Sequence, residues 1–276
     1  MARIHTILQG FVDINLETDE NVNTKIIPTN QLQQAIGALN LNSGFVVLRK
    51  SLSVPDRVEL PVPAEVLFEA IGINISSVQS AHIQGSRLYG VDNFDSDWDL
   101  AVISTDVVGH RFLEASIDGN EFDVHLYSKQ EFQNRLNNHE MRELEFLSHP
   151  EKFFIINNKS FSVELDSDKL VNKVKLESDE LWNRAKFILD SDGIQYVALK
   201  NIWHSFRFLI FAEQILKDGK ITDFSAANYL YESIINSKQS NFEFFELNFS
   251  TLRDTLKLNL DTYKKDGGLE FIDLTV

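Results

Sequence analysis

An Asp-x-Asp pair followed by a third aspartate is the feature that most constrains the fold of this 276-residue chain. Asp97 and Asp99 open an apolar, β-rich segment over residues 98–104, and Asp123 lies in the alternating segment 121–127. Successive side chains of a strand point to opposite faces, so Asp97 and Asp99 are expected on one face. If the two segments are neighbouring strands, three carboxylates converge on one pocket.

Such a cluster of carboxylates indicates a cation site, because carboxylates side by side repel each other unless a cation lies between them. The chain has no cysteine, which excludes disulfides and thiolate ligands. Hard oxygen ligands suit Mg²⁺ or Mn²⁺. Residues 61–150 hold fifteen Asp and Glu against five Lys and Arg. This excess is either a solvated acidic face or a cation site, and the spacing of the aspartates favours the second. Three converging carboxylates are what two ions need for phosphoryl transfer.

The Gly85-Ser86 pair predicts a phosphate-binding turn. It follows a segment, residues 78–84, that is typical of a strand, and it leads toward the aspartate pair. A strand that ends in Gly-Ser and turns into a helix offers free backbone N–H groups to a phosphate. Glycine allows the main chain to approach a ligand closely, and the Ser86 hydroxyl can donate one more hydrogen bond.

Beyond these segments, the pattern predicts further strands and helices, with a helical last third. A capping box at Ser128 and Glu131 predicts a helix that reaches about Leu147. Residues 1–60 are the hardest to interpret, with a short helix expected over 31–39 and a β-rich stretch over 45–48. The other expected helices are 64–71 with a stop at Gly72, one from Ser178 or Asp179 to Leu189, 194–217 closed by Gly219, 225–236 and 247–264.

Gly-Ser, then Asp-x-Asp, then an aspartate in a later strand resembles the polymerase-beta-like nucleotidyltransferase superfamily. The fuller motif, with Arg87, Tyr89 and Gly90, is most similar to the branch associated with RNA ligases in RNA-repair gene clusters. The likeness covers roughly residues 63–220. It implies an α+β fold: a small mixed β-sheet core backed by helices over 61–150, then a helical domain over 151–276 that closes the nucleotide cleft. Residues 1–60 would be an N-terminal extension without an assigned role.

The resemblance also implies an activity. Two Mg²⁺ (or Mn²⁺) ions would be held by Asp97, Asp99 and Asp123, with an NTP such as ATP as the substrate. The enzyme would transfer a nucleoside monophosphate to a hydroxyl and release pyrophosphate. Resemblance to the RNA-repair branch favours an RNA 3′ end as the acceptor. Two alternatives stay open: a protein or small-molecule hydroxyl as the acceptor, or a non-catalytic module that binds nucleotide.

Cationic side chains that could hold the triphosphate lie on the long helix expected over 194–217. Lys200, His204 and Arg207 are spaced i, i+4, i+7 and form a polar stripe on an otherwise apolar helix. They are predicted, with Gly85, Ser86 and Arg87 of the motif, to bind the nucleotide. The alternative is that these side chains lie on a solvent-exposed face of the helix, with only their aliphatic parts packed along its surface. His125 shares the face of Asp123, which suggests a supporting role.

Composition limits the partners of the chain. Its formal net charge of -15 argues against a broad surface for nucleic-acid phosphates, although the end of an RNA needs few contacts. There is no run of about 18 apolar residues, so no membrane span is expected. Residues 1–21 lack the basic start and apolar centre of a signal peptide. A cytoplasmic location is therefore expected.

Overall fold

The structure, a computed structural model, describes residues 3–7, 11–15, 58–158, 161–191, 193–237 and 239–264. The chain divides into two compact units, Met1–Ser51 and Leu52–Val276. In the first unit, β1 (Arg3–Ile7) and β2 (Phe11–Asn15) form an antiparallel hairpin that the sequence analysis did not predict. The segments expected over 31–39 and 45–48 lie outside the described residues. The expected division into a core over 61–150 and a helical part over 151–276 stays a prediction.

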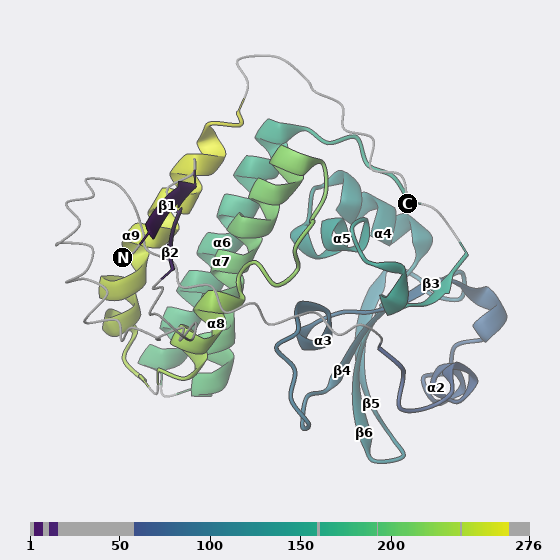
Figure 1. Cartoon of the computed structure of the whole chain (residues 1–276). Coiled ribbons are helices and arrows are strands. Elements are labelled where there is room, and N and C mark those ends of the chain that lie inside the picture. The colour runs from purple at the N-terminus through teal and green to yellow at the C-terminus, as the bar shows by residue number, and fades with distance from the viewer. Residues whose placement is uncertain are drawn as a thin grey trace. The chain divides into compact units, whose positions relative to one another are not determined.

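The second unit contains a five-stranded mixed sheet in the order β5-β6-β4-β3-β7 (Figure 1). β4 and β6 are parallel neighbours, and the other pairs are antiparallel. The expected strands over 78–84, 98–104 and 121–127 are confirmed within a residue at each end, whereas β5 and β7 were not predicted. The strands are β3 (Val78–Ile83), β4 (Trp98–Ser104), β5 (His110–Ile117), β6 (Asn120–Tyr127) and β7 (Phe154–Asn157).

The hairpin between β5 and β6 has a local cause in the sequence. Its two central residues, Asp118 and Gly119, have φ of 50° and 78°. Asp-Gly suits such a turn because both positions need positive φ, and this turn matches the twist of the flanking strands. Along β6, Phe122 and Val124 are buried while Asp123 and His125 are partly exposed, the alternation that the sequence predicted.

The helices between the strands are short. α2 (Ala64–Ala70) ends just before Gly72, which has φ of 70°, as expected. α3 (Ser86–Tyr89) directly follows β3. The 3-10 turns η1 (Ile75–Ser77) and η2 (Glu151–Phe153) precede β3 and β7.

The helix expected from Ser128 to about Leu147 is interrupted. Ser128 caps it as predicted, its hydroxyl accepting from the backbone N–H of Glu131. However, α4 (Lys129–Asn137) stops, and α5 (Met141–Phe146) starts afresh. Between them His139 has φ of 60°, and its Nε2 accepts from the backbone N–H of Asp166 at 3.0 Å. This long-range hydrogen bond accompanies the left-handed conformation that breaks the helix.

The last third is helical, as predicted. The four helices are α6 (Ser167–Asp190), α7 (Gln195–Asp218), α8 (Asn228–Ile235) and α9 (Phe242–Asp261), with α6 and α7 side by side along their length (Figure 1). Gly219, in the left-handed conformation, closes α7 as expected. The expected start of α6 at Ser178 or Asp179 is wrong, because Asp166 caps the helix. Asp179 instead lies within α6 and pairs with Arg253 of α9.

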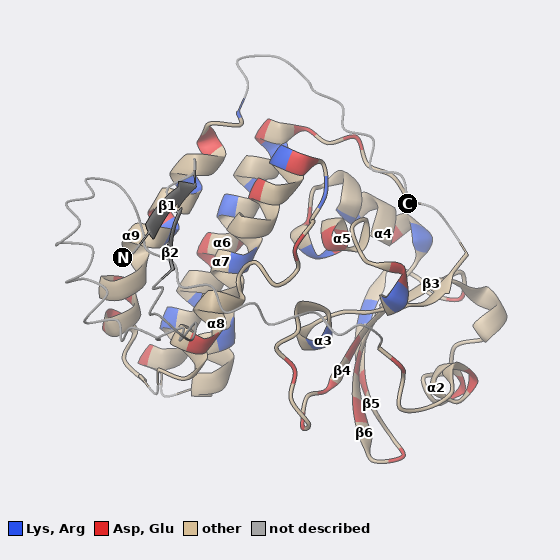
Figure 2. Ribbon diagram, viewed as in Figure 1, with Lys and Arg blue, Asp and Glu red and all other residues tan. Residues whose placement is uncertain are grey.

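The mixed sheet and the helical region together make an α+β fold, which confirms the expected fold class. Aromatic side chains fill much of the core of the described residues. Acidic residues occur along β4 and β6, while Lys and Arg lie mainly on the helices (Figure 2). No helix in the described ranges has the length and apolar character needed to cross a membrane.

Candidate active site

The aspartates of the predicted site lie on neighbouring parallel strands. In the register of β4 with β6, Asp99 is directly opposite Asp123. Side chains that face each other on neighbouring strands share one face of the sheet. Asp97 lies one residue before β4, and its charge acts on both other carboxylates. The structure therefore brings these three residues together.

The electrostatics of the pair indicate a crowded acidic site. Burial, together with the charges of Asp123 and Asp97, raises the pKa of Asp99 to about 6, although Lys200 and Arg142 act in the opposite direction. The pKa of Asp123 is also raised, first by burial and then by the charge of Asp97. Each raised pKa means that the ionised form of that carboxyl is disfavoured at this position.

The Gly-Ser turn lies against the aspartate pair. Gly85 has φ of 71°, and a Cβ atom at this position would lie 1.9 Å from Oδ2 of Asp99. The backbone N–H of Gln84 donates to the carbonyl of Asp99 at 2.8 Å. Gly85 is thus required both by the backbone conformation and by the close approach of the carboxylate. Ser86, half-buried, begins α3 beside this contact.

Two cationic side chains act on the carboxylates through their charge. Lys200 of α7, half-buried, acts on both Asp99 and Asp123. Arg142 of α5 acts on Asp99. Lys200 was predicted, whereas Arg142 was not. Arg142 reaches the site only because α5 starts afresh after the break at His139, and no local pattern in the sequence marks that break.

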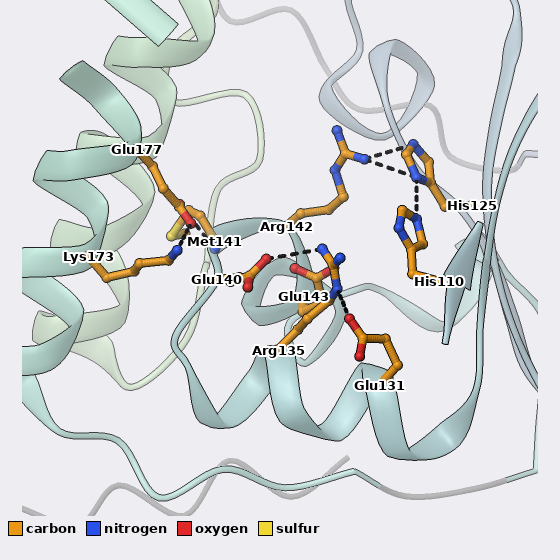
Figure 3. A network of polar contacts seen from close by, with 10 residues as sticks. All are labelled: His110, His125, Glu131, Arg135, Glu140, Met141, Arg142, Glu143, Lys173 and Glu177. Atoms are coloured by element: carbon orange, nitrogen blue, oxygen red, sulfur yellow. Dashed lines mark hydrogen bonds and ion pairs between the residues drawn. The ribbon is translucent and has the colours of Figure 1, made fainter. Parts of the chain in front are cut away.

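His125 connects Arg142 to the sheet (Figure 3). Nη1 of Arg142 donates to Nε2 of His125 at 2.7 Å, and Nδ1 of His125 lies 3.1 Å from Nε2 of His110. Burial and the charge of Arg142 lower the pKa of His125 to about 3. His125 is therefore neutral and accepts from Arg142, because a guanidinium has no acceptor atom. A supporting role of His125 at the carboxylates stays a prediction.

Arg87, predicted to bind nucleotide, is committed to the loop that carries the aspartates. It pairs with Asp92 at 3.0 Å, and its Nη2 donates to the carbonyl of Ser96 at 2.6 Å. Its guanidinium also lies 3.9 Å from the ring centroid of Trp98. These contacts hold the loop that precedes β4. They give no support to phosphate binding by Arg87.

Arg207 and His204, also predicted to bind nucleotide, belong to a buried network. Arg207 pairs with Glu145 at 2.9 Å, with side chains only 5% and 3% exposed. Tyr89 donates to the same carboxylate oxygen at 2.6 Å, and Nε of Arg207 donates to Nδ1 of His204 at 3.1 Å. The polar stripe therefore divides: Lys200 faces the carboxylates, and Arg207 joins α7 to α5.

The donor atoms of the aspartates fit a hard divalent cation, since all are carboxylate oxygens. A bound cation would also relieve the repulsion that raises the pKa of Asp99 and Asp123. As the side chains stand, no group of three or more His, Asp or Glu among the described residues could hold a metal ion. A cation shared by all three aspartates would therefore require their side chains to rotate.

Comparison with known proteins adds little to this geometry. No protein-family model matches the chain, and neither does any curated protein. Among solved structures, it is similar to a nucleotidyltransferase-like protein from Exiguobacterium sibiricum 255-15, with 16% sequence identity over 68% of this chain and 69% of that one, and a TM-score of 0.26. A TM-score this low does not show a shared fold.

Proposed function

We propose that this chain is a metal-dependent nucleotidyltransferase, which transfers a nucleoside monophosphate from an NTP to a hydroxyl group. One observation carries the proposal: Asp99 and Asp123 face each other on parallel strands, with Asp97 beside them and the Gly85 turn against Asp99. This combination of paired carboxylates with a Gly-Ser turn supports handling of a phosphate with a divalent cation.

The chain's own residues have distinct roles in this proposal. Asp97, Asp99 and Asp123 would hold Mg²⁺ or Mn²⁺, which supplies charge neutralisation and a lowered pKa for an acceptor hydroxyl. Lys200 would hold the triphosphate as a point charge, and the Ser86 hydroxyl would donate to it. The acceptor hydroxyl loses its proton to water, its oxygen forms a bond to the α-phosphorus, the bond from that phosphorus to the bridging oxygen breaks, and pyrophosphate leaves.

The acceptor we propose is an RNA 3′ end. The support is the resemblance of the Gly85 to Asp99 motif to the RNA-repair branch. The strongly acidic composition favours a short contact at an RNA end over a long nucleic-acid footprint. Transfer to a protein or small-molecule hydroxyl is the alternative, and so is a module that binds nucleotide without turnover.

A labelling experiment tests the proposal. The protein is incubated with each of the four NTPs labelled at the α-phosphate, Mg²⁺ or Mn²⁺, and a mixed RNA pool. We expect label on RNA with wild type and a loss of about 100-fold or more with D99N, because the variant lacks a carboxylate ligand for the cation that would neutralise charge in the transition state. The matched control is D106N, an exposed aspartate in the turn after β4.

Each outcome of the labelling decides between the candidates. Label on RNA that depends on Asp99 supports the proposal in full. Label on a protein or a small molecule keeps the transferase and replaces the acceptor. NTP binding without any labelled product contradicts the proposed enzymatic activity and favours the alternative of a module that binds nucleotide without turnover.

A further inference from the structure

A hollow between α5, α6 and α7 is lined by Arg142, whose charge also acts on Asp99, and none of the roles described above involves this hollow. Its volume is about 280 Å³. α5 contributes Arg142 and Glu143, α6 contributes Glu177 and Arg184, and the ring of Phe208 from α7 forms part of its wall. Figure 3 draws several of these side chains, with Arg142 between the histidines of the sheet and the helices.

Two guanidinium groups in this hollow form no ion pair with a carboxylate of the described residues, although Arg142 acts on Asp99 through its charge. Arg142 donates only to the neutral ring of His125, and Arg184 makes no hydrogen bond or ion pair with any residue in the described ranges. Arg142 is surrounded by protein atoms yet stays accessible to solvent, as expected of a side chain that lines a concave site. Guanidinium groups without an acidic partner are ready-made donors to a phosphate.

Most carboxylates of the hollow are already compensated. Glu140 pairs with Arg135 at 3.1 Å, and Glu177 pairs with Lys173 at 3.3 Å. Glu143, whose side chain is 2% exposed, also pairs with Arg135, at 3.7 Å, and its Oε1 accepts no hydrogen bond from the described residues. Burial raises the pKa of Glu143 to about 7. The ion pair is too long for a hydrogen bond, so this oxygen can still accept one from a ligand that supplies an N–H or O–H donor.

The hollow is close enough to the carboxylates to hold another part of the same substrate. Arg142 acts on Asp99 and also lines the hollow. Along α7, the charge of Lys200 acts on the carboxylates, and Phe208 lines the hollow. These two residues are separated by about 12 Å of helix, at about 1.5 Å per residue. This separation is on the scale of a nucleotide.

We propose that this hollow is a phosphate subsite, in which Arg142 and Arg184 hold a phosphate group of a nucleotide and Glu143 accepts a hydrogen bond from the same nucleotide unit. The inference rests on the proposed function for the identity of that nucleotide. Its phosphate belongs either to the NTP donor or to the RNA acceptor. The volume lies just below the usual range for pockets that enclose a whole small molecule, and therefore fits one part of a substrate.

Binding measurements test the subsite without turnover. One probe is adenosine triphosphate with a methylene group between the α and β phosphorus atoms, in the presence of Mg²⁺. The other is a single-stranded RNA hexamer with a free 3′ hydroxyl. Titration calorimetry compares wild type with R142Q, R184Q and the charge-retaining R142K. The matched control is R111Q, an exposed arginine on β5. Circular dichroism melting verifies folding, and R184Q serves if R142Q does not fold, because Arg184 is exposed.

We expect R184Q and R142Q each to weaken one probe by about tenfold or more, R142K to weaken it less, and R111Q to stay within about twofold of wild type. Weaker binding of the triphosphate analogue assigns the hollow to the NTP donor. Weaker binding of the hexamer assigns it to the RNA acceptor. If wild type binds neither probe, or if R184Q and R142Q bind both as wild type does, the subsite is contradicted. A failed nucleotidyltransferase proposal gives a different result, the absence of labelled product with wild-type protein.

Discussion

At the scale of single residues, Gly85 joins the phosphate-binding turn to the metal-binding carboxylates of the proposed function. An alanine there would need the left-handed conformation, and its Cβ would lie 1.9 Å from Oδ2 of Asp99. We expect Gly85→Ala to lower the free energy of unfolding by about 2–4 kcal/mol, because backbone strain and displacement of a carboxylate both contribute. Urea denaturation followed by circular dichroism measures this loss.

Gly72 is the matched control for this prediction. It has φ of 70°, almost the same as Gly85, but a Cβ there would meet no atom within 4 Å. Gly72→Ala therefore carries only the backbone cost of about 1–2 kcal/mol. The difference between the two variants isolates the contact with Asp99. Equal losses would mean that the carboxylate moves away freely and does not define the site.

At the scale of elements, local patterns in the sequence specified the strands that carry the aspartates. Alternation around Asp123 and the apolar run after Asp99 predicted β6 and β4 nearly to the residue. That β4 and β6 pair in parallel had to be assumed, because no local pattern in the sequence shows which strands are neighbours. β5 was missed although Asp118-Gly119 is a turn signal, because its residues alternate only weakly between buried and exposed.

The helical elements show where local patterns are insufficient. Asp166 rather than Asp179 caps α6, and the hydrogen bond from Asp166 to His139 accompanies the break between α4 and α5. That break positions Arg142 at the site. Arg207 was predicted from its spacing to hold phosphate, but its partner Glu145 is 62 residues away in the sequence. Such long-range pairings depend on tertiary packing and could not be predicted from one sequence.

The ion pair between Glu145 of α5 and Arg207 of α7 gives an element-scale prediction. Both side chains are buried, so removal of one partner leaves an uncompensated charge. We expect Glu145→Gln to lower the free energy of unfolding by about 3–5 kcal/mol. The double variant Glu145→Gln with Arg207→Met should lose less than the sum of the single variants, because both charges are then absent. Denaturant melts of all four proteins measure the coupling.

A surface pair on α4 is the control for this cycle. Glu131 and Arg135 are spaced i, i+4 at 2.8 Å and are about a third exposed. Glu131→Gln should therefore change the free energy of unfolding by less than about 1 kcal/mol. If Glu145→Gln costs no more than Glu131→Gln, the buried pair does not hold α5 to α7.

At the scale of the whole molecule, the net charge of -15 links folding to cations. The fold forces Asp99 and Asp123 into opposite positions on neighbouring strands, with Asp97 beside them, and their repulsion is a cost paid only in the folded state. A divalent ion that binds there stabilises the folded chain by mass action, by about 2.7 kcal/mol at a hundred times its dissociation constant.

We therefore expect Mn²⁺ with an NTP to raise the melting temperature of the wild-type protein. Asp97→Asn should raise the melting temperature without metal, since it removes a repelling charge. The same variant should lose most of the increase that Mn²⁺ and NTP produce, since it also removes a ligand. Asp106→Asn removes one exposed charge from the end of β4 and should keep the full increase. Differential scanning fluorimetry with and without EDTA measures all three proteins. An equal response of wild type and Asp97→Asn to Mn²⁺ and NTP would show that these carboxylates are not the metal site.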